Sequence, residues 1–179
     1  MDLLERARRV EMLLMDVDGT LTEGTLLVMP DGEEVKAYHV WDGLGILLAQ
    51  MAGLKVGIIT GKTSKALEKR AARLRIAEVY QGIVDKKRIL DTICAKHGIA
   101  PDRIAYIGDD IGDLEVMKSV GLAGAVADAH PDVKESCHLI CRTRGGRGAV
   151  REFIEYILKA QDKWDAVKNR IQEIKSFTV

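Results

Sequence analysis

The sequence predicts an α/β protein whose mainly parallel central sheet is covered by helices on both faces. Short apolar strands alternate with helical patterns along most of the 179 residues, as in consecutive β-α-β units. The strands are continuously apolar, which is typical of sheets buried on both sides. No internal repeat or long linker interrupts this pattern. We therefore expect one domain over residues 1–179, a Rossmann-like three-layer sandwich with a β-hairpin insertion after the first strand.

The first half of the chain alternates strand and helix around that insertion. Residues 11–17 are expected to form the first core strand, and a hairpin at about residues 24–41 turns at Gly32. Residues 43–52 read as a helix with Asp42 as its candidate N-cap. This half ends with a core strand at residues 54–60, an amphipathic helix at 64–75 and a short strand at 78–82.

The second half continues the same alternation. A helix over residues 86–97 is stopped by Gly98 and Pro101. A core strand at residues 103–108 and a helix at about 111–119 follow. Two weaker strands come next, at 122–126 and 138–141, and then a long helix at about 148–160 and a polar helical tail at about 161–179.

Composition excludes several classes of protein. Lys and Arg together number 27, equal to Asp and Glu, so no global basic field favours nucleic acid or an anionic membrane. No apolar stretch approaches the roughly 18 residues of a membrane span, and residues 1–10 lack the apolar core of a signal peptide. These observations indicate a cytoplasmic protein.

The three cysteines favour reduced, structural thiols. Cys94, Cys137 and Cys141 are odd in number, so they cannot all pair within one chain. Cys137, His138 and Cys141 offer an alternative zinc site. Residues four apart along a strand lie about 13 Å from each other, however, which is too far for one tetrahedral ion.

Polar side chains gather where the predicted core strands end. Ligands of open parallel sheets bind beyond the carboxyl ends of the strands, so residues at these positions are candidates for a site. The candidates are Asp16 and Asp18, then Thr60, Gly61 and Lys62, then Lys86, and finally Gly108, Asp109, Asp110 and Asp113.

Each of these residues also has a purely structural interpretation. Asp18 can belong to a turn, Thr60 to a strand exit, Asp110 to a helix N-cap, and Lys86 to the solvated surface. Together these interpretations fail, because carboxylates clustered at one edge repel each other unless a cation joins them. Asp16 and Asp109 therefore predict a hard divalent ion with oxygen ligands, and Mg²⁺ is the expected one.

The same residues predict phosphoryl transfer. A phosphate dianion would complete the Mg²⁺ shell and accept hydrogen bonds from Thr60 and Lys86. One carboxylate can act as nucleophile to form an aspartyl-phosphate. A second carboxylate two residues later can protonate the leaving oxygen and then activate water.

Four segments of the chain resemble the motifs of the haloacid dehalogenase-like phosphatases. They are DVDGT at residues 16–20, IITGK at 58–62, Lys86, and GDDIGD at 108–113. GEEVKAYHVWDGLGI, YQGIVDK, AVADAHPDV and GGRGAVRE extend the resemblance over nearly the whole chain, to a small cap-less subgroup. This subgroup includes octulosonate 8-phosphate phosphatases and nonulosonate 9-phosphate phosphatases.

The resemblance implies a role for each residue of the strand ends. Asp16 would be the nucleophile and a Mg²⁺ ligand, and Asp18 the general acid/base with its backbone carbonyl on the ion. Thr60 and Lys86 would bind the phosphoryl group. Asp109 would be the third protein ligand, supported by Asp110 and Asp113. The implied substrate contacts are His39, Trp41, Asp42, Gly43, Gly61, Lys62 and Arg70.

Three positions depart from the octulosonate phosphatases of that family. Trp41 stands where these usually carry Arg, Leu47 where some carry a basic residue, and Lys62 where Arg is common. A lysine supplies a point charge in place of a bidentate fork. Trp41 could instead be a packing residue, and Arg70 a solvated helix charge. These departures concern the sugar carboxylate and leave the phosphatase chemistry intact.

The expected function is hydrolysis of a sugar-acid phosphate, with octulosonate 8-phosphate favoured over nonulosonate 9-phosphate. A non-catalytic assembly domain related to this family is one alternative, and the intact Asp16, Asp18, Lys86 and Asp109 argue against it. A phosphoacceptor signalling domain is another, but it has no use for an acid/base two residues after the nucleophile.

The hairpin predicts contact with another subunit, and the family resemblance implies a homotetramer. No cap domain is inserted, yet phosphoryl transfer gains from the exclusion of water, and an isolated hairpin with apolar side chains is marginal. Related phosphatases are homotetramers whose hairpins pack together, so the same assembly is expected here. The tail after about Lys163 would be mobile or folded over a neighbour. The alternative is a hairpin that folds back on its own sheet.

Overall fold

The centre of the protein is a six-stranded parallel sheet with the strand order β5-β4-β1-β6-β7-β8. The structure is a computed structural model and describes residues 1–171. The predicted α/β sandwich is confirmed. The strands are β1 (Met12–Met15), β4 (Lys55–Ile59), β5 (Glu78–Tyr80), β6 (Ile104–Gly108), β7 (Leu122–Ala125) and β8 (Leu139–Ile140).

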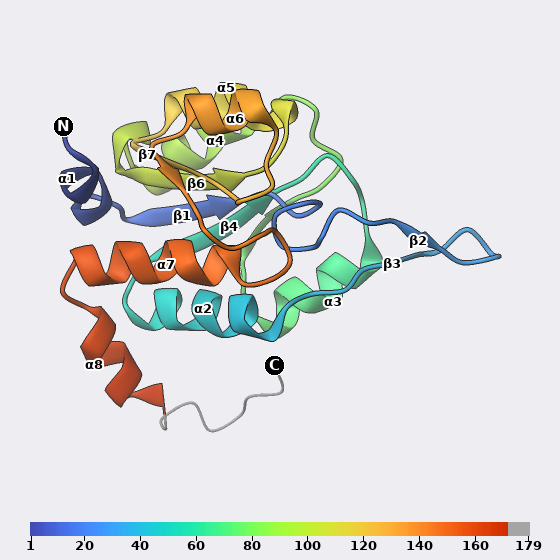
Figure 1. The fold of residues 1–179 in the computed structure, drawn as a ribbon, viewed down its shortest axis with the longest axis horizontal. Helices are drawn as coiled ribbons and strands as arrows, with labels where there is room; N and C mark the ends of the chain where they lie inside the picture. The colour runs from blue at the N-terminus through green and yellow to red at the C-terminus, as the bar shows by residue number, and fades with distance from the viewer. Residues whose placement is uncertain (172–179) are drawn as a thin grey trace.

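Helices cover both faces of this sheet (Figure 1). On one face lie α2 (Val40–Met51), α3 (Lys65–Arg73) and α7 (Ala149–Ala160), and on the other α4 (Lys86–His97), α5 (Leu114–Ser119) and α6 (Pro131–Ser136). The remaining helices are α1 (Leu3–Arg8), α8 (Trp164–Asn169) and the short 3₁₀ turns η1 (Pro101–Arg103) and η2 (Ile111–Asp113). Within residues 1–171, no helix is long and apolar enough to cross a membrane.

Strand β1 occupies the middle of the sheet. It pairs with β4 on one side and β6 on the other, so that Met15 lies opposite both Ile58 and Ile107. All four residues of Met12–Met15 are fully buried, which explains why the strand is apolar on both faces. The residues that follow β1, β4 and β6 therefore emerge side by side at one edge of the sheet.

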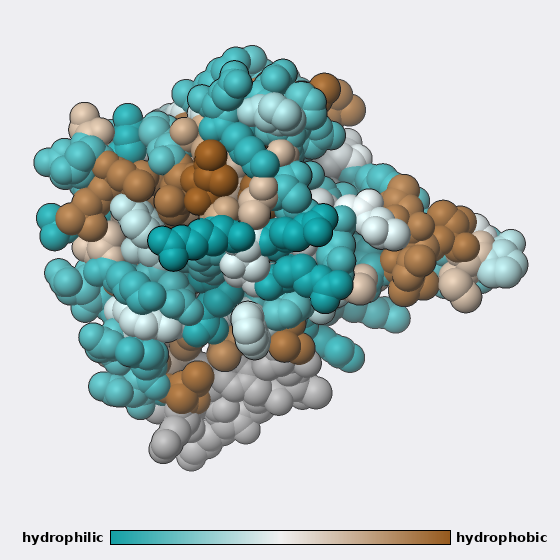
Figure 2. Space-filling view, in the orientation of Figure 1, coloured by the Kyte–Doolittle hydropathy of each residue, from teal (hydrophilic) through white to brown (hydrophobic). Residues whose placement is uncertain are grey.

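The hairpin after β1 projects from the body of the protein (Figure 1). Its strands β2 (Leu27–Val28) and β3 (Glu34–Val35) are antiparallel and only two residues long. The turn uses Gly32 with φ +84°, where a side chain would be strained. Figure 2 shows hydrophobic residues gathered on this projection, and Leu26, Leu27, Val28 and Met29 are all exposed.

Helix α2 begins earlier than the sequence predicts, and Asp42 does not cap it. The N-cap is His39, whose ring Nδ1 accepts from the Trp41 backbone N–H at 3.3 Å. The carboxylate of Asp42 is buried and accepts from the backbone N–H groups of Gly148 and Arg151, at 3.2 and 2.8 Å. It thus satisfies free donors at the start of α7, where Gly148 has no side chain to do so.

Two α-helices were not predicted from the sequence, and a third corrects part of the expectation for the tail. Helix α1 begins in a capping box between Asp2 and Glu5, and α6 starts at Pro131. Helix α8 lies within the helical tail expected at about residues 161–179, and it packs on α7 of its own chain and buries Val167. The expectation that this part of the tail is mobile is therefore wrong, and contact with a neighbouring subunit stays a prediction. Residues 172–179, on which the rest of that prediction falls, lie outside the described residues.

Candidate active site

Three carboxylates meet at the edge where β1 and β6 end. Asp16 follows β1, Asp109 follows β6, and Asp113 closes the turn η2. One oxygen atom from each of the three lies within 4.8 Å of the others. The pairing of Met15 with Ile107 brings Asp16 and Asp109 level with each other, so the sheet register itself builds this cluster.

Lys86 lies between two of these carboxylates. Its ammonium donates to Asp16 Oδ1 at 2.8 Å and to Asp113 Oδ1 at 2.6 Å, and the lysine is only 8% exposed. Burial alone would lower the pKa of Lys86, but the charges of Asp16 and Asp113 raise it above its usual value. Lys86 is therefore a fixed positive charge, delivered by the first residue of α4.

The carboxylate cluster carries more negative charge than its single lysine can compensate. Burial, followed by the charge of Asp113, raises the pKa of Asp16 to about 6, although Lys86 opposes the shift. Burial raises the pKa of Asp109 to about 8, against a hydrogen bond from Thr20 and together with the charges of Asp16 and Asp113. One lysine does not neutralise the cluster. All its donors are carboxylate oxygens, which fits a hard divalent cation such as Mg²⁺.

Asp113 holds the neighbouring residues of the cluster in place by hydrogen bonds. It is 1% exposed, and its Oδ1 accepts from the Tyr106 hydroxyl at 2.6 Å as well as from Lys86. Its Oδ2 accepts from the backbone N–H groups of Asp109 and Asp110, at 3.0 and 3.3 Å. Both oxygens are thus used to hold neighbours, whereas the exposed Asp110 caps η2.

Asp18 lies two residues beyond Asp16, in the loop that leaves β1. Its Oδ1 forms an ion pair with Lys36 of the hairpin. Its Oδ2 is buried and has no hydrogen-bond partner in residues 1–171. The next residue, Gly19, has φ +91°, and a Cβ there would lie 2.0 Å from Asp109 Oδ2. Only glycine fits between the two acidic loops.

The loop after β4 brings Thr60, Gly61 and Lys62 to the same edge. Thr60 is 2% exposed. Its backbone is fixed, because the Thr60 N–H donates to the Tyr80 carbonyl at 2.9 Å. Lys62 pairs with Glu34 of the hairpin at 3.3 Å. A hydroxyl and a cation therefore follow β4 at the sheet edge where the carboxylates follow β1 and β6.

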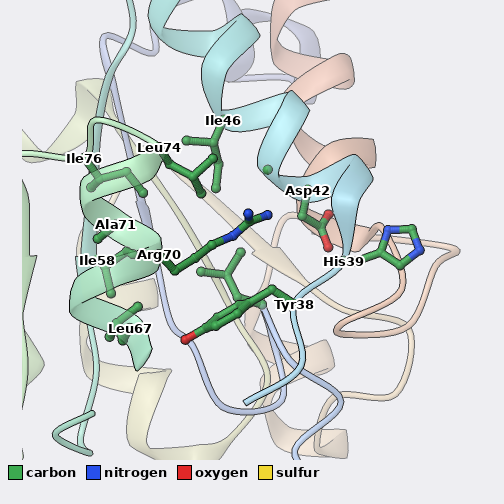
Figure 3. Close-up of a pocket in the computed structure, with 12 residues that line it drawn as sticks. Tyr38, His39, Asp42, Ile46, Ile58, Leu67, Arg70, Ala71, Leu74 and Ile76 are labelled. Carbon is green, nitrogen blue, oxygen red and sulfur yellow. The ribbon is translucent and has the colours of Figure 1, made fainter. Parts of the chain in front are cut away.

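The implied substrate contacts are divided between two places. Arg70 points into a pocket lined by Tyr38, His39 and Gly43, and Figure 3 shows its guanidinium between the Tyr38 ring and Asp42. The guanidinium carbon lies 5.7 Å from the centre of the Tyr38 ring. Trp41 lies outside this pocket, 62% exposed, and lines a separate open groove along α7.

Three residues at the site were not singled out from the sequence. Thr20 donates to Asp109 Oδ1 at 2.8 Å, Tyr106 donates to Asp113, and Lys36 pairs with Asp18. Tyr106 carried a usable signal, as the one polar-tipped side chain within an otherwise apolar core strand. Lys36 carried a signal too, because residues 34, 36 and 38 share one face of an extended arm.

Comparisons with known proteins agree with this geometry. The family model described as haloacid dehalogenase-like hydrolase matches residues 59–154. The 3-deoxy-D-manno-octulosonate 8-phosphate phosphatase of Escherichia coli K12 is 43% identical over 169 residues, which cover 94% of this chain and 90% of that protein.

Solved structures resemble the whole chain. A crystal structure of 3-deoxy-D-manno-octulosonate 8-phosphate phosphatase from Yersinia pestis has 44% identity and a TM-score of 0.90, covering 92% of this chain and 89% of that one. The Moraxella catarrhalis enzyme of the same name, in complex with a magnesium ion, a phosphate ion and a KDO molecule, has 36% identity and a TM-score of 0.92. That match covers 95% of this chain and 98% of the other.

Proposed function

The chain belongs to the haloacid dehalogenase-like hydrolases, and from that premise we propose that it is a Mg²⁺-dependent phosphatase acting on 3-deoxy-D-manno-octulosonate 8-phosphate. The observation that carries this proposal is the cluster of Asp16, Asp109 and Asp113 around Lys86 at the strand ends. Relatives that align over nearly the whole chain bear the name of this activity.

The metal site uses residues that the sheet already places together. Carboxylate oxygens of Asp16 and Asp109 and the backbone carbonyl of Asp18 would hold Mg²⁺, and Asp113 keeps the Asp109 loop in place through its backbone. When bound there, the ion neutralises the clustered carboxylates and stabilises charge on the phosphoryl oxygens. Thr20 fixes the Asp109 carboxylate by a hydrogen bond at 2.8 Å.

In the first step the phosphoryl group moves from the sugar to the protein. A carboxylate oxygen of Asp16 attacks phosphorus, the bond from phosphorus to the sugar oxygen breaks, and Asp18 donates its proton to that oxygen. Lys86 and the Thr60 hydroxyl hold the phosphoryl oxygens, which neutralises and orients the group as it transfers. The product at this stage is an aspartyl-phosphate on Asp16.

In the second step water releases the phosphate. Asp18, now a carboxylate, accepts a proton from water as the water oxygen attacks phosphorus, and the bond to Asp16 breaks. Asp16 and Asp18 both return to their starting states. The two residues of spacing between them let one loop supply both the nucleophile and the acid/base.

The activity is tested by a phosphate-release screen with purified protein and Mg²⁺. We expect turnover of 3-deoxy-D-manno-octulosonate 8-phosphate well above that of hexose phosphates, and no turnover by Asp16→Asn, because an amide is not a nucleophile. Preference for a nonulosonate 9-phosphate would correct the substrate, and Trp41 makes that the second candidate. Absence of turnover on every phosphate ester would contradict the proposal and favour an assembly domain.

The carboxylate of the sugar would be bound by the cationic side chains of Arg70 and Lys62, near the pocket shown in Figure 3. Arg70, His39 and Gly43 line this pocket. Gly61 and Lys62 would contribute from the loop that follows β4, whose residue Ile58 also lines the pocket. Lys62→Ala and Arg70→Ala should raise KM for the sugar-acid phosphate more than for p-nitrophenyl phosphate. Lys65→Ala removes an exposed cation nearby and is the matched control. Equal losses on both substrates would contradict this role.

Hairpins that pack together in a homotetramer would cover the exposed apolar side chains of Leu27 and Val28, which are 55% and 62% exposed. Light scattering of the wild type should give a tetramer, and Leu27→Glu with Val28→Glu should give a smaller species. Val84→Glu changes an exposed valine elsewhere and should keep the tetramer. A monomeric wild type with full activity would refute the assembly.

The cytoplasmic location stays a prediction, testable by cell fractionation.

A further inference from the structure

The returning arm of the hairpin reaches back to the catalytic edge. Residues 34, 36 and 38 are half-buried while residues 33, 35 and 37 are exposed, which is the alternation of an extended strand. The inward residues each contact the site: Glu34 pairs with Lys62, Lys36 with Asp18, and the Tyr38 ring stacks with Arg70. One face of this arm therefore belongs to the active site.

Lys36 is more buried than Glu34, the other charged residue of that face. Its side chain is 4% exposed, and the ammonium pairs with Oδ1 of Asp18, whose own side chain is 22% exposed. Burial of a long, flexible lysine chain is costly unless its charge is paired. Since Asp18 provides that partner, the contact fixes both side chains in one orientation.

We propose that Lys36 positions the Asp18 side chain for proton donation to the leaving oxygen of the substrate. The inference rests on the proposed phosphatase function. Lys36 takes up Oδ1, so that Oδ2, which is buried and has no partner in residues 1–171, is the oxygen left to act. Lys36 touches neither the nucleophile nor, by this proposal, the phosphoryl group.

The step that depends on this orientation is the departure of the sugar. The Asp16 oxygen forms its bond to phosphorus, the bond from phosphorus to the sugar oxygen breaks, and the proton on Asp18 Oδ2 passes to that oxygen. An alkoxide is a poor leaving group and needs this proton, whereas p-nitrophenolate is weakly basic and leaves without it. A misplaced Asp18 should therefore harm alkyl phosphates selectively.

The test compares kcat/KM for the sugar-acid phosphate and for p-nitrophenyl phosphate, because kcat/KM reports the steps up to leaving-group departure. Lys36→Met should lower kcat/KM for the sugar-acid phosphate about tenfold or more, and for p-nitrophenyl phosphate by less than about twofold. Lys36→Arg keeps the ion pair and should restore most of the loss. Added to Asp18→Asn, Lys36→Met should cost nothing further on the sugar-acid phosphate.

Two matched variants separate this role from others. Glu34→Gln breaks the other ion pair of the same arm, so it should not discriminate between the leaving groups. Lys118→Met removes an exposed lysine on α5 and should leave both rates unchanged. Equal losses on both substrates in Lys36→Met, or a further loss on top of Asp18→Asn, would overturn the proposal. Wild-type turnover of p-nitrophenyl phosphate tests the phosphatase function separately.

Discussion

Replacing Gly19 by alanine should weaken the metal site more than the fold. The new Cβ would lie 2.0 Å from Asp109 Oδ2, while ordinary contact begins at 3.4 Å, so the carboxylate must retreat by about 1.4 Å. Mg²⁺ requires near-ideal octahedral geometry, with ligand distances conserved to about 0.2 Å. Asp109 would thus be lost as a ligand, together with its 2.8 Å hydrogen bond from Thr20.

A second glycine, Gly53, lets the loss of folding stability in Gly19→Ala be divided into a part from backbone strain and a part from the steric clash. Gly53 has φ +88°, close to the +91° of Gly19, but nothing lies within 4 Å of a Cβ there. Gly53→Ala should therefore report the cost of the left-handed backbone alone, about 1–2 kcal/mol. Gly19→Ala should add about 1–3 kcal/mol for the clash, and about a hundredfold loss of kcat/KM from misplacement of the ligand.

The assays are urea unfolding in the absence of metal, Mg²⁺ titration by calorimetry, and phosphate release. Gly53→Ala should keep Mg²⁺ affinity and activity, since the residue lies between α2 and β4, beyond the site. Gly19→Ala should lower both. If Gly19→Ala bound Mg²⁺ as the wild type does, Asp109 would not be the ligand that this loop positions, and the reasoning would be refuted.

Three further changes test other parts of the structure. Asp18→Asn should lower turnover of the sugar-acid phosphate about 10²–10⁴-fold yet keep Mg²⁺ affinity in calorimetry, because the proposed ligand is its backbone carbonyl. Tyr106→Phe removes the hydroxyl that donates to Asp113 at 2.6 Å, so urea unfolding should show a loss of about 1.5–3 kcal/mol, and no loss would contradict a structural role. Burial alone would raise the pKa of Glu78, but hydrogen bonds from Lys96, Tyr80 and His97 hold it below its usual value of 4.5. The resulting stabilisation is present above about pH 4.5 and lost as the pH falls through the lower folded pKa, so Glu78→Gln should flatten the acid limb of melting temperature against pH, and an unchanged limb would argue against the shift.

Much of the fold could be predicted because the core strands are apolar without interruption. The strands at residues 12–15, 55–59 and 104–108 lie within the ranges expected, and Gly98 ends α4 in the left-handed conformation as a C-cap glycine should. The start of α2 could not be predicted. Asp42 is a good N-cap residue by type, but its partner is the backbone of α7, more than a hundred residues away in sequence.

The site was partly predictable for the same reason. Asp16 and Asp109 follow recognisable core strands, so the rule for parallel sheets brings them together. Contacts made by the hairpin could not be placed, because a hairpin's direction depends on tertiary packing that its own sequence does not specify. Lys36 and Tyr38 reach the site only because the arm that carries them bends back over it.

The central position of β1 has a consequence for how the protein is made. This strand is synthesised before its neighbours β4 and β6, which begin at Lys55 and Ile104. Pairings over such long sequence separations form slowly, because a large loop must close before any contact rewards it. The apolar residues Met12–Met15 have no neighbouring strand until β4 is made, and they lack the second until β6 is made. The strand that precedes the proposed nucleophile is therefore exposed to aggregation until β6 has been synthesised. Asp16 and Asp109 can come together only once β6 has paired with β1.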